Sequence, residues 1–124
     1  GEAGDEGYGE FIGMEKRIKE ENFFLRSGFN RTMISQLTGL SSSRVAELIE
    51  RYAQCSPIDY VNKLKVEYSI KLIHDHPNWT IDAIADASGF GSRNTYYHHF
   101  KRIYGITPAQ YRKRSLEMKE KSGI

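Results

Sequence analysis

The sequence predicts an all-α protein of seven helices, in which a two-helix unit occurs twice and a long central helix joins the copies. The main observation is an internal repeat with an offset of about fifty residues. Its first copy contains Phe29, Asn30, Ile34, Gly39, Ser41 and Ser56-Pro57, and its second contains Trp79, Thr80, Ile84, Gly89, Ser92 and Thr107-Pro108. The second observation is apolar spacing of i, i+3, i+4 and i+7, with no alternating strand pattern.

The N-terminal region predicts a leader followed by one helix. Residues 1–9 contain four glycines and no apolar periodicity, so we expect a disordered leader, with Gly1 a remnant of cloning. The chain also begins without methionine, and we expect it to be part of a longer protein. A first helix is expected from about Glu10 to Phe24.

Each copy of the repeat predicts two short helices around a tight turn. An aromatic residue, a capping residue and an apolar residue four positions later match an N-cap with a hydrophobic staple. Gly39 and Gly89 can take the left-handed conformation that ends a helix, and Ser41 and Ser92 cap the next one. The second helices then place apolar or packed residues on one face, at Val45, Leu48, Ile49 and Tyr52 or at Tyr96, His99, Phe100 and Ile103. This is the helix-turn-helix pattern, whose second helix can enter the DNA major groove.

Pro57 and Pro108 predict the starts of the remaining helices, because proline favours the first helical position. The long helix should run to about His74, before Pro77, and the last one to about Glu120. The long helix carries two apolar stripes, one of Val61, Leu64, Tyr68 and Leu72 and one of Val66, Ile70 and Ile73. They predict that it bridges the two units. Its length of roughly 27 Å approaches the roughly 34 Å between successive major-groove faces. The expected domains are a first helix-turn-helix subdomain at 10–56, a linking helix at 57–76, a second subdomain at 77–121 and a tail at 122–124.

Charge is distributed unevenly along a chain whose formal net charge is only +2. Residues 1–24 carry seven acids and three bases, which leaves nine acids and fifteen bases for residues 25–124. No acid occurs between Ala87 and Leu116, where six bases lie: Arg93, Lys101, Arg102, Arg112, Lys113 and Arg114. Unbalanced bases that coincide with a helix-turn-helix indicate a phosphate-binding surface.

The second copy also resembles a known family. Ile84-Ala85, Gly89-Phe90, Phe100-Lys101 and the run from Gly105 through Thr107-Pro108 to Tyr111-Arg112 are similar to the DNA-binding domain of AraC/XylS-type bacterial transcription regulators. The resemblance covers about residues 10–115 and implies two homeodomain-like subdomains. It also implies RNA polymerase as a further candidate partner and an upstream sensing or dimerisation domain outside this segment. In the first copy, Ile49-Glu50 and Gln54 depart from the family pattern.

Candidate DNA contacts lie on the outward faces of the two second helices. Helical spacing exposes Ser42, Ser43, Ala46, Glu47 and Glu50 on one, and Arg93, Asn94, Tyr97, His98 and Lys101 on the other. The resemblance implies base contacts from Ser43, Arg44, Glu47, Arg93, Asn94, Tyr97 and His98. Arg51, Lys101, Arg102 and Arg112 are better placed for the DNA backbone. The second unit therefore carries the stronger set of candidate DNA contacts.

Other functions find less support in the sequence. Adjacent histidines on a helix cannot share one ion, and the single cysteine offers no cluster, so we expect neither metal nor cofactor. No nucleophile motif or phosphate loop is present, which argues against an enzyme. We expect a cytoplasmic domain without membrane contact, although the parent protein can be linked to a membrane. The alternative is a helical protein-interaction module with weak or secondary DNA binding, which the acidic Glu47 and Glu50 favour.

Overall fold

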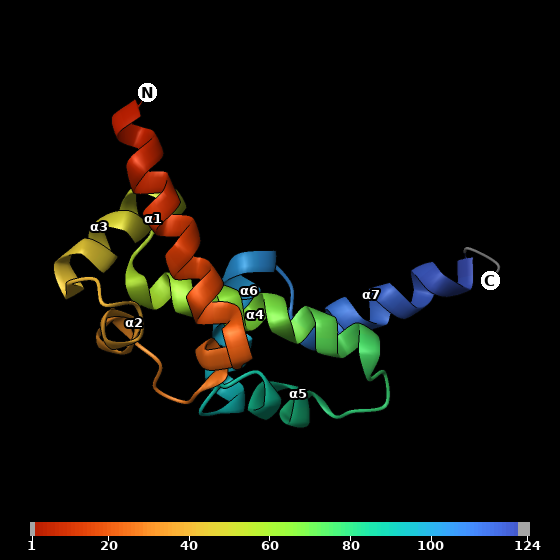
Figure 1. The fold of residues 1–124 in the computed structure, drawn as a ribbon. Helices are drawn as coiled ribbons and strands as arrows, with labels where there is room; N and C mark the ends of the chain where they lie inside the picture. Colours follow the sequence, from red (N-terminus) through yellow and green to blue (C-terminus); the bar gives the residue numbers. More distant parts are fainter. Residues whose placement is uncertain (1, 122–124) are drawn as a thin grey trace. The chain divides into compact units, whose positions relative to one another are not determined.

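The computed structural model describes residues 2–121, with side chains from Gly7 onward, and every regular element in that range is helical (Figure 1). The α-helices are α1 (Glu2–Lys19), α2 (Arg31–Thr38), α3 (Ser42–Ala53), α4 (Pro57–Asp75), α5 (Ile81–Ala87), α6 (Arg93–Tyr104) and α7 (Pro108–Lys121). The chain forms two compact units that meet within α4, between Leu64 and Lys65. The expected all-α fold of seven helices is confirmed. Over the described range, no helix has the length and apolar composition to cross a bilayer.

The first helix differs from its expected bounds at both ends. It begins at Glu2, so residues 2–9 are helical where the sequence favours a disordered leader. The reason is a contact with α3: Gly7 is buried so closely that a Cβ there would lie 2.6 Å from the Tyr52 hydroxyl, and the Tyr8 ring packs edge-on against Tyr52. Gly1 and the expected tail at residues 122–124 lie outside the described residues.

The C-terminal end of α1 gives way to a short 3-10 segment, η1 (Glu20–Leu25), before the expected end at Phe24. Glu21 and Asn22 have φ values of 53° and 57°, and two consecutive left-handed residues cannot continue an α-helix. This kink turns the chain so that Phe24 returns to the interior.

Local hydrogen bonds build the first helix-turn-helix as the sequence predicts. The Asn30 side chain accepts from the Met33 amide at the start of α2, and the Ser41 hydroxyl accepts from the Arg44 amide at the start of α3. Gly39 ends α2 with φ of 79°. Packing of α1, α2 and α3 then buries their apolar faces, which include Phe11, Met14, Ile18, Ile34, Val45, Leu48 and Ile49.

The apolar residues of α4 divide along the helix rather than into two stripes around it. Tyr60 belongs to the first unit, where its ring packs near Phe11 and its hydroxyl donates to Glu15. The second core instead takes residues from both predicted stripes of the C-terminal half, namely Val66, Tyr68, Ile70, Leu72 and Ile73. Each half of α4 therefore completes a different core, whereas the sequence places residues 57–76 in a linker of their own.

The second unit closes around Tyr96 and Phe100 of α6, both fully buried. Thr80 and Ser92 cap α5 and α6 as predicted, through the amides of Ala83 and Thr95. Burial raises the pKa of Tyr96 to about 12, because the apolar surroundings disfavour its phenolate form.

Two contacts of the second unit are not apparent from the repeat. The Lys65 ammonium is buried and donates to the Gly89 carbonyl at 2.9 Å, so it ties α4 to the turn of the helix-turn-helix. Burial also lowers the pKa of Lys65. Trp79, the counterpart of the buried Phe29, stays 38% exposed, and its ring stacks on His76 with a centroid distance of 4.0 Å.

Candidate nucleic-acid interface

Packing fixes which face of α3 is turned outward. Val45, Leu48 and Ile49 are buried, and the Ser41 cap sets the start of the helix. The opposite face exposes Ser43, Glu47 and Glu50, with Ser42 and Ala46 half-buried beside them. The predicted outward face of the first recognition helix is therefore placed as the pattern requires, and it carries no exposed base among these five residues.

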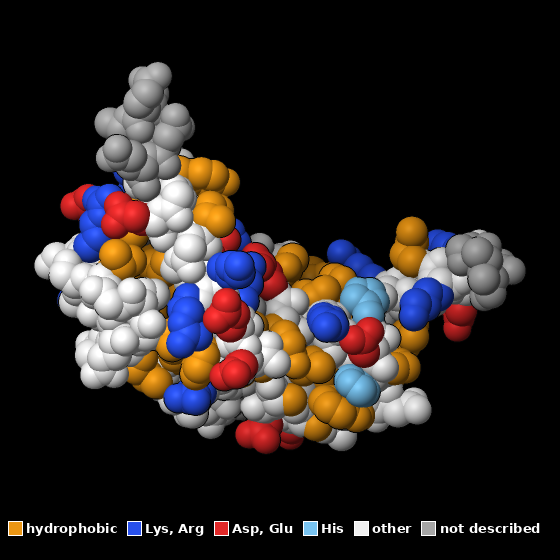
Figure 2. All heavy atoms as spheres, viewed as in Figure 1, with side chains coloured by type: hydrophobic (Ala, Val, Ile, Leu, Met, Phe, Trp, Pro, Cys, Tyr) orange, Lys and Arg blue, Asp and Glu red, His pale blue; other side chains and the backbone are white. Residues whose placement is uncertain are grey.

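Arg44 is the one base near the start of α3, and two carboxylates hold it. Its Nη2 donates to Oε1 of Glu10 on α1 at 2.5 Å, and its Nε donates to Oε2 of the same carboxylate at 3.5 Å. Its Nη1 donates to Glu47, one turn along α3. The Arg44 hydrogen bond holds the pKa of Glu10 below its usual value, and Glu10 in turn raises the pKa of Arg44. Figure 2 shows acidic and basic side chains touching where α3 runs beside α1.

The outward face of α6 is basic and polar. Tyr96 and Phe100 anchor its inner face, which leaves Arg93, Asn94 and His98 exposed at its N-terminal half. The predicted core position Ile103 instead stays 41% exposed, and Tyr104 beside it stays 42% exposed. They lie in the last turn of α6, where the core cluster contains only residues from earlier turns of the helix.

Arg93 is held more loosely than Arg44. Its Nη2 donates to the Tyr97 hydroxyl at 3.3 Å, and its guanidinium lies 5.0 Å from the centre of the Tyr97 ring. One carboxylate, that of Asp82 on α5, approaches its Nε at 3.4 Å. The Tyr97 hydrogen bond and the Asp82 charge raise the pKa of Arg93. Tyr97 is half-buried against the core, so it can position Arg93 while its own ring stays fixed.

The expected backbone contacts fall into two groups. Arg51, Lys101 and Arg102 are exposed, with the Arg51 guanidinium 5.5 Å from the centre of the Tyr52 ring. Arg112 is half-buried, and its Nη1 donates to the Trp79 carbonyl. That bond ties α7 to the loop before α5, so Arg112 has a structural role in the free protein.

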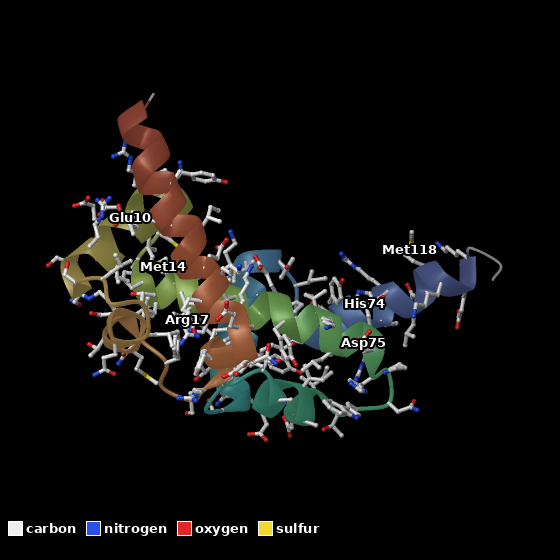
Figure 3. The ribbon with its side chains drawn as sticks, viewed as in Figure 1. Glu10, Met14, Arg17, His74, Asp75 and Met118 are labelled. Atoms are coloured by element: carbon white, nitrogen blue, oxygen red, sulfur yellow. The ribbon has the colours of Figure 1, made fainter. Side chains whose placement is uncertain are left out.

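Two surface clefts lie away from these faces. Glu10, Met14 and Arg17 follow one side of α1 (Figure 3) and line a cleft of about 290 Å³ together with Leu37 and Leu40. In the second unit, His74 and Met118 border a cleft of about 550 Å³ beside α7. Both nitrogens of His74 are engaged there, by the hydroxyls of Tyr111 and Ser115. Over residues 7–121, no group of three His, Cys, Asp or Glu side chains could hold a metal ion.

Sequence reasoning missed the acidic partners of the two arginines. Glu10 lies 34 positions before Arg44, and Asp82 lies on a different helix from Arg93. No local pattern relates either pair, because periodicity describes one helix at a time. Only the packing of α1 on α3, and of α5 on α6, brings these carboxylates to the start of each recognition helix.

The chain is similar in sequence to proteins of known function. Residues 34–114, about two thirds of the chain, match the family model described as a helix-turn-helix domain. The chain is 28% identical over 86 residues to the HTH-type transcriptional regulator GlxA of Rhizobium meliloti (strain 1021). This match covers 69% of the chain and 26% of that regulator, so the chain corresponds to about a quarter of its relative.

Solved structures share the fold. A transcriptional regulator from Chromobacterium violaceum, titled as an AraC-type DNA-binding domain-containing protein, superimposes with a TM-score of 0.68 at 21% identity. That match covers 92% of this chain and 96% of the other. The DNA-binding domain of AdpA, solved in complex with a target DNA, gives a TM-score of 0.69 at 19% identity over 82% of this chain and 90% of its own.

Proposed function

Because the chain belongs to the AraC/XylS-type helix-turn-helix family, we propose that it binds double-stranded DNA sequence-specifically, as the output domain of a transcription regulator. Its relatives are named as regulators rather than as enzymes. A DNA ligand also implies that the domain works in the cytoplasm. Membership of this family also leads us to propose an upstream sensing or dimerisation domain and RNA polymerase as its protein partners.

The outward face of α6 supports this proposal most directly. Arg93, Asn94 and His98 are exposed on the first turns of a capped helix, where base edges are read in the family's geometry. Arginine can bind guanine through two donors, asparagine can pair with adenine, and histidine can donate or accept at a base edge. No acidic residue follows Ala87 until after Leu116, so nothing in this stretch opposes the approach of phosphate.

A second part of the proposal concerns how α3 and α6 contact the DNA site. We propose that α3 and α6 enter successive major grooves of one duplex, and that the site is asymmetric because its two readers are tandem copies with different faces. In the first unit, Ser43, Arg44 and Glu47 are the proposed base contacts, and Arg51 is the proposed backbone contact. In the second, Arg93, Asn94, Tyr97 and His98 read bases, while Lys101, Arg102 and Arg112 contact the backbone.

Substitutions in α6 test the proposal. Arg93→Ala and His98→Ala should each reduce discrimination between a preferred and an unrelated duplex by about tenfold, because each removes a base contact. Lys101→Ala should weaken binding to both duplexes alike and flatten the salt dependence by about one unit of slope. Fluorescence anisotropy titrations at several salt concentrations measure both effects, with a preferred duplex selected by the wild-type chain from a random library.

Lys71→Ala provides the matched control, since Lys71 is an exposed lysine of α4 for which no DNA contact is proposed. This variant should bind like the wild-type chain. Undiminished discrimination in both the Arg93 and the His98 variants would contradict the assignment of α6 as the main reader.

One observation favours the second candidate, a protein-interaction module. The outward face of α3 carries Glu47 and Glu50, and Arg44 near the start of the helix is paired with acids. A gel-shift series against genomic fragments at low and high salt separates the candidates. An interaction module would bind weakly and would prefer no fragment.

A further inference from the structure

The Arg44 guanidinium holds Glu10 through one of the two edges with which it could bind a base. Nε and Nη2 form one edge of the planar fork, and both donate to the Glu10 carboxylate. Nη1 is taken by Glu47. A guanine edge, with its O6 and N7 acceptors, also requires two donors from one edge of the fork. A guanine that is read through Nε and Nη2 must therefore displace Glu10. One that is read through Nη1 and Nη2 must displace Glu47 and must approach beside the Glu10 carboxylate.

The charges around Arg44 work in the same direction. Glu10 and Glu47 place two carboxylates on one guanidinium, and Glu50 follows on the exposed face of α3. Together with Arg51 of the same helix, this group holds three acids and two bases, so phosphate that approaches α3 meets a surface of net negative charge. A contact from Arg44 to DNA requires its release from at least one of its acids. Arg44 and both acids are partly exposed, so release requires only rotation of side chains at the surface.

The second unit offers an internal comparison. Among the residues that the structure describes, Arg93 forms an ion pair with one carboxylate, that of Asp82 at 3.4 Å from Nε, and its Nη2 donates to the Tyr97 hydroxyl. A base can therefore take the fork of Arg93 at a smaller cost in lost ion pairs than the fork of Arg44.

We propose that Glu10 of α1 sets the DNA affinity of the first unit by competing with DNA for Arg44. The inference rests on the proposed function and deepens it, since it assigns a specificity-determining role to a residue outside the recognition helices and outside the matched residues 34–114. Glu10 touches no DNA in this scheme. It acts through Arg44 and keeps that side chain from unspecific contacts until a site that offers a guanine edge displaces it.

Glu10→Gln tests the proposal, because it keeps the shape of the side chain and removes the charge that holds Arg44. The variant should bind the duplex selected by the wild-type chain about three- to fivefold more tightly, as expected for the loss of one competing surface ion pair. The gain should vanish in an Arg44→Ala background, where there is no guanidinium to release. Anisotropy titrations of the two single variants, the double variant and the wild-type chain complete the cycle.

Glu20→Gln is the matched control. Glu20 forms an exposed ion pair with Arg17 at 3.1 Å, so this substitution removes the same charge from the first unit without affecting Arg44. It should change affinity less than twofold, since only the long-range effect of one charge remains. Thermal unfolding followed by circular dichroism verifies that all variants are folded.

The possible outcomes separate the two proposals. A gain in Glu10→Gln that is absent from Glu20→Gln and from the Arg44→Ala background supports the inference. Equal effects of Glu10→Gln and Glu20→Gln overturn it, as does a loss of affinity in Glu10→Gln, which would show that Glu10 positions Arg44 for DNA. If the wild-type chain selects no duplex, the proposed function fails first and the inference falls with it.

Discussion

Arg44 and Arg93 stand near the starts of the two recognition helices and differ in how their own unit holds them. Arg44 is bonded to two carboxylates, while Arg93 is supported by Tyr97 and, within the described residues, is approached by the single carboxylate of Asp82. Both arginines are exposed enough that solvent screens their ion pairs, so neither pair is a large source of stability. The ion pairs matter because they determine how many donors of each guanidinium are already occupied.

Acid should weaken the contribution of Glu10 to stability. Its pKa is lowered in the folded protein, chiefly by the Arg44 hydrogen bond, so its stabilising effect is present above the unfolded value of 4.5 and is lost as pH falls through the lowered value. The melting temperature of the wild-type chain should therefore exceed that of Glu10→Gln by a small margin near neutral pH. The margin should shrink below about pH 4.5 and vanish at lower pH.

Circular dichroism melts across this pH range measure the margin. In an Arg44→Ala background the same substitution should produce no pH-dependent difference. A margin that grows as the pH falls would contradict the sign of the expected pKa shift.

At the scale of elements, the two copies end their recognition helices with different residues in the same conformation. Gln54 closes α3 with φ of 58°, and Gly105 closes α6 with φ of 78°. The left-handed conformation costs a residue with a Cβ about 1 to 2 kcal/mol, so the first unit carries a strain that the second avoids. Gln54, which departs from the family pattern, therefore makes the end of α3 less stable than the end of α6, although the two ends have similar conformations.

Exchanging these residues should shift stability in opposite directions. Gln54→Gly should stabilise the protein by about 0.5 kcal/mol, because relief of strain exceeds the entropy that glycine adds to the unfolded chain. Gly105→Gln should destabilise it by about 1 kcal/mol. A Cβ at Gly105 would meet no atom within 4 Å, so the cost there is conformational alone.

Urea unfolding monitored by circular dichroism measures both changes. Gly13→Ala is the control: Gly13 lies inside α1 with open space around it, so loss of that glycine should stabilise the helix. If Gly105→Gln proved as stable as the wild-type chain, the left-handed helix end would not carry the expected cost.

For the molecule as a whole, the two units carry unequal charges on the outward faces of α3 and α6. Glu50 of α3 and Lys101 of α6 occupy equivalent places in the repeat, 51 residues apart as Ser41 and Ser92 are, and both are exposed. We expect the second unit to supply most of the affinity and the first to refine the choice of site. The division follows from side chains on the surface, since both units keep the same caps and turns.

Exchange of these two charges tests the division. Glu50→Lys should tighten DNA binding and steepen its salt dependence by about one unit of slope, while Lys101→Glu should do the reverse. The double variant keeps the net charge of the chain. It should nevertheless bind more weakly than the wild-type chain, because a lysine on α3 lies beside Glu47 whereas the lysine on α6 lies in an acid-free stretch. Anisotropy titrations over a range of salt concentrations would refute the unequal division if the double variant matched the wild type.

The sequence by itself determined the all-α fold, the starts and caps of the helices after α1, and the outward faces of α3 and α6. Caps join residues three positions apart, and a glycine turn depends on a single φ value, so both can be read from neighbouring letters. The repeat presents the same caps and glycine turn a second time, which supports the assignment of both motifs. For this reason the two helix-turn-helix motifs were placed correctly, together with the exposure of Arg93, Asn94 and His98.

Tertiary structure alone decided the rest. The helical state of residues 2–9 depends on packing against Tyr52. The position of the Trp79 ring depends on stacking with His76, and Glu10 decides how many donors Arg44 keeps for other partners. The same holds for α4, whose apolar residues are divided between two cores by what packs on each half. Apart from the His76–Trp79 pair, which lies within one loop, these outcomes depend on distances between side chains far apart in the chain or on different helices. The periodicity of a single helix contains no information about such distances, because it fixes the direction of a side chain and not what the side chain meets.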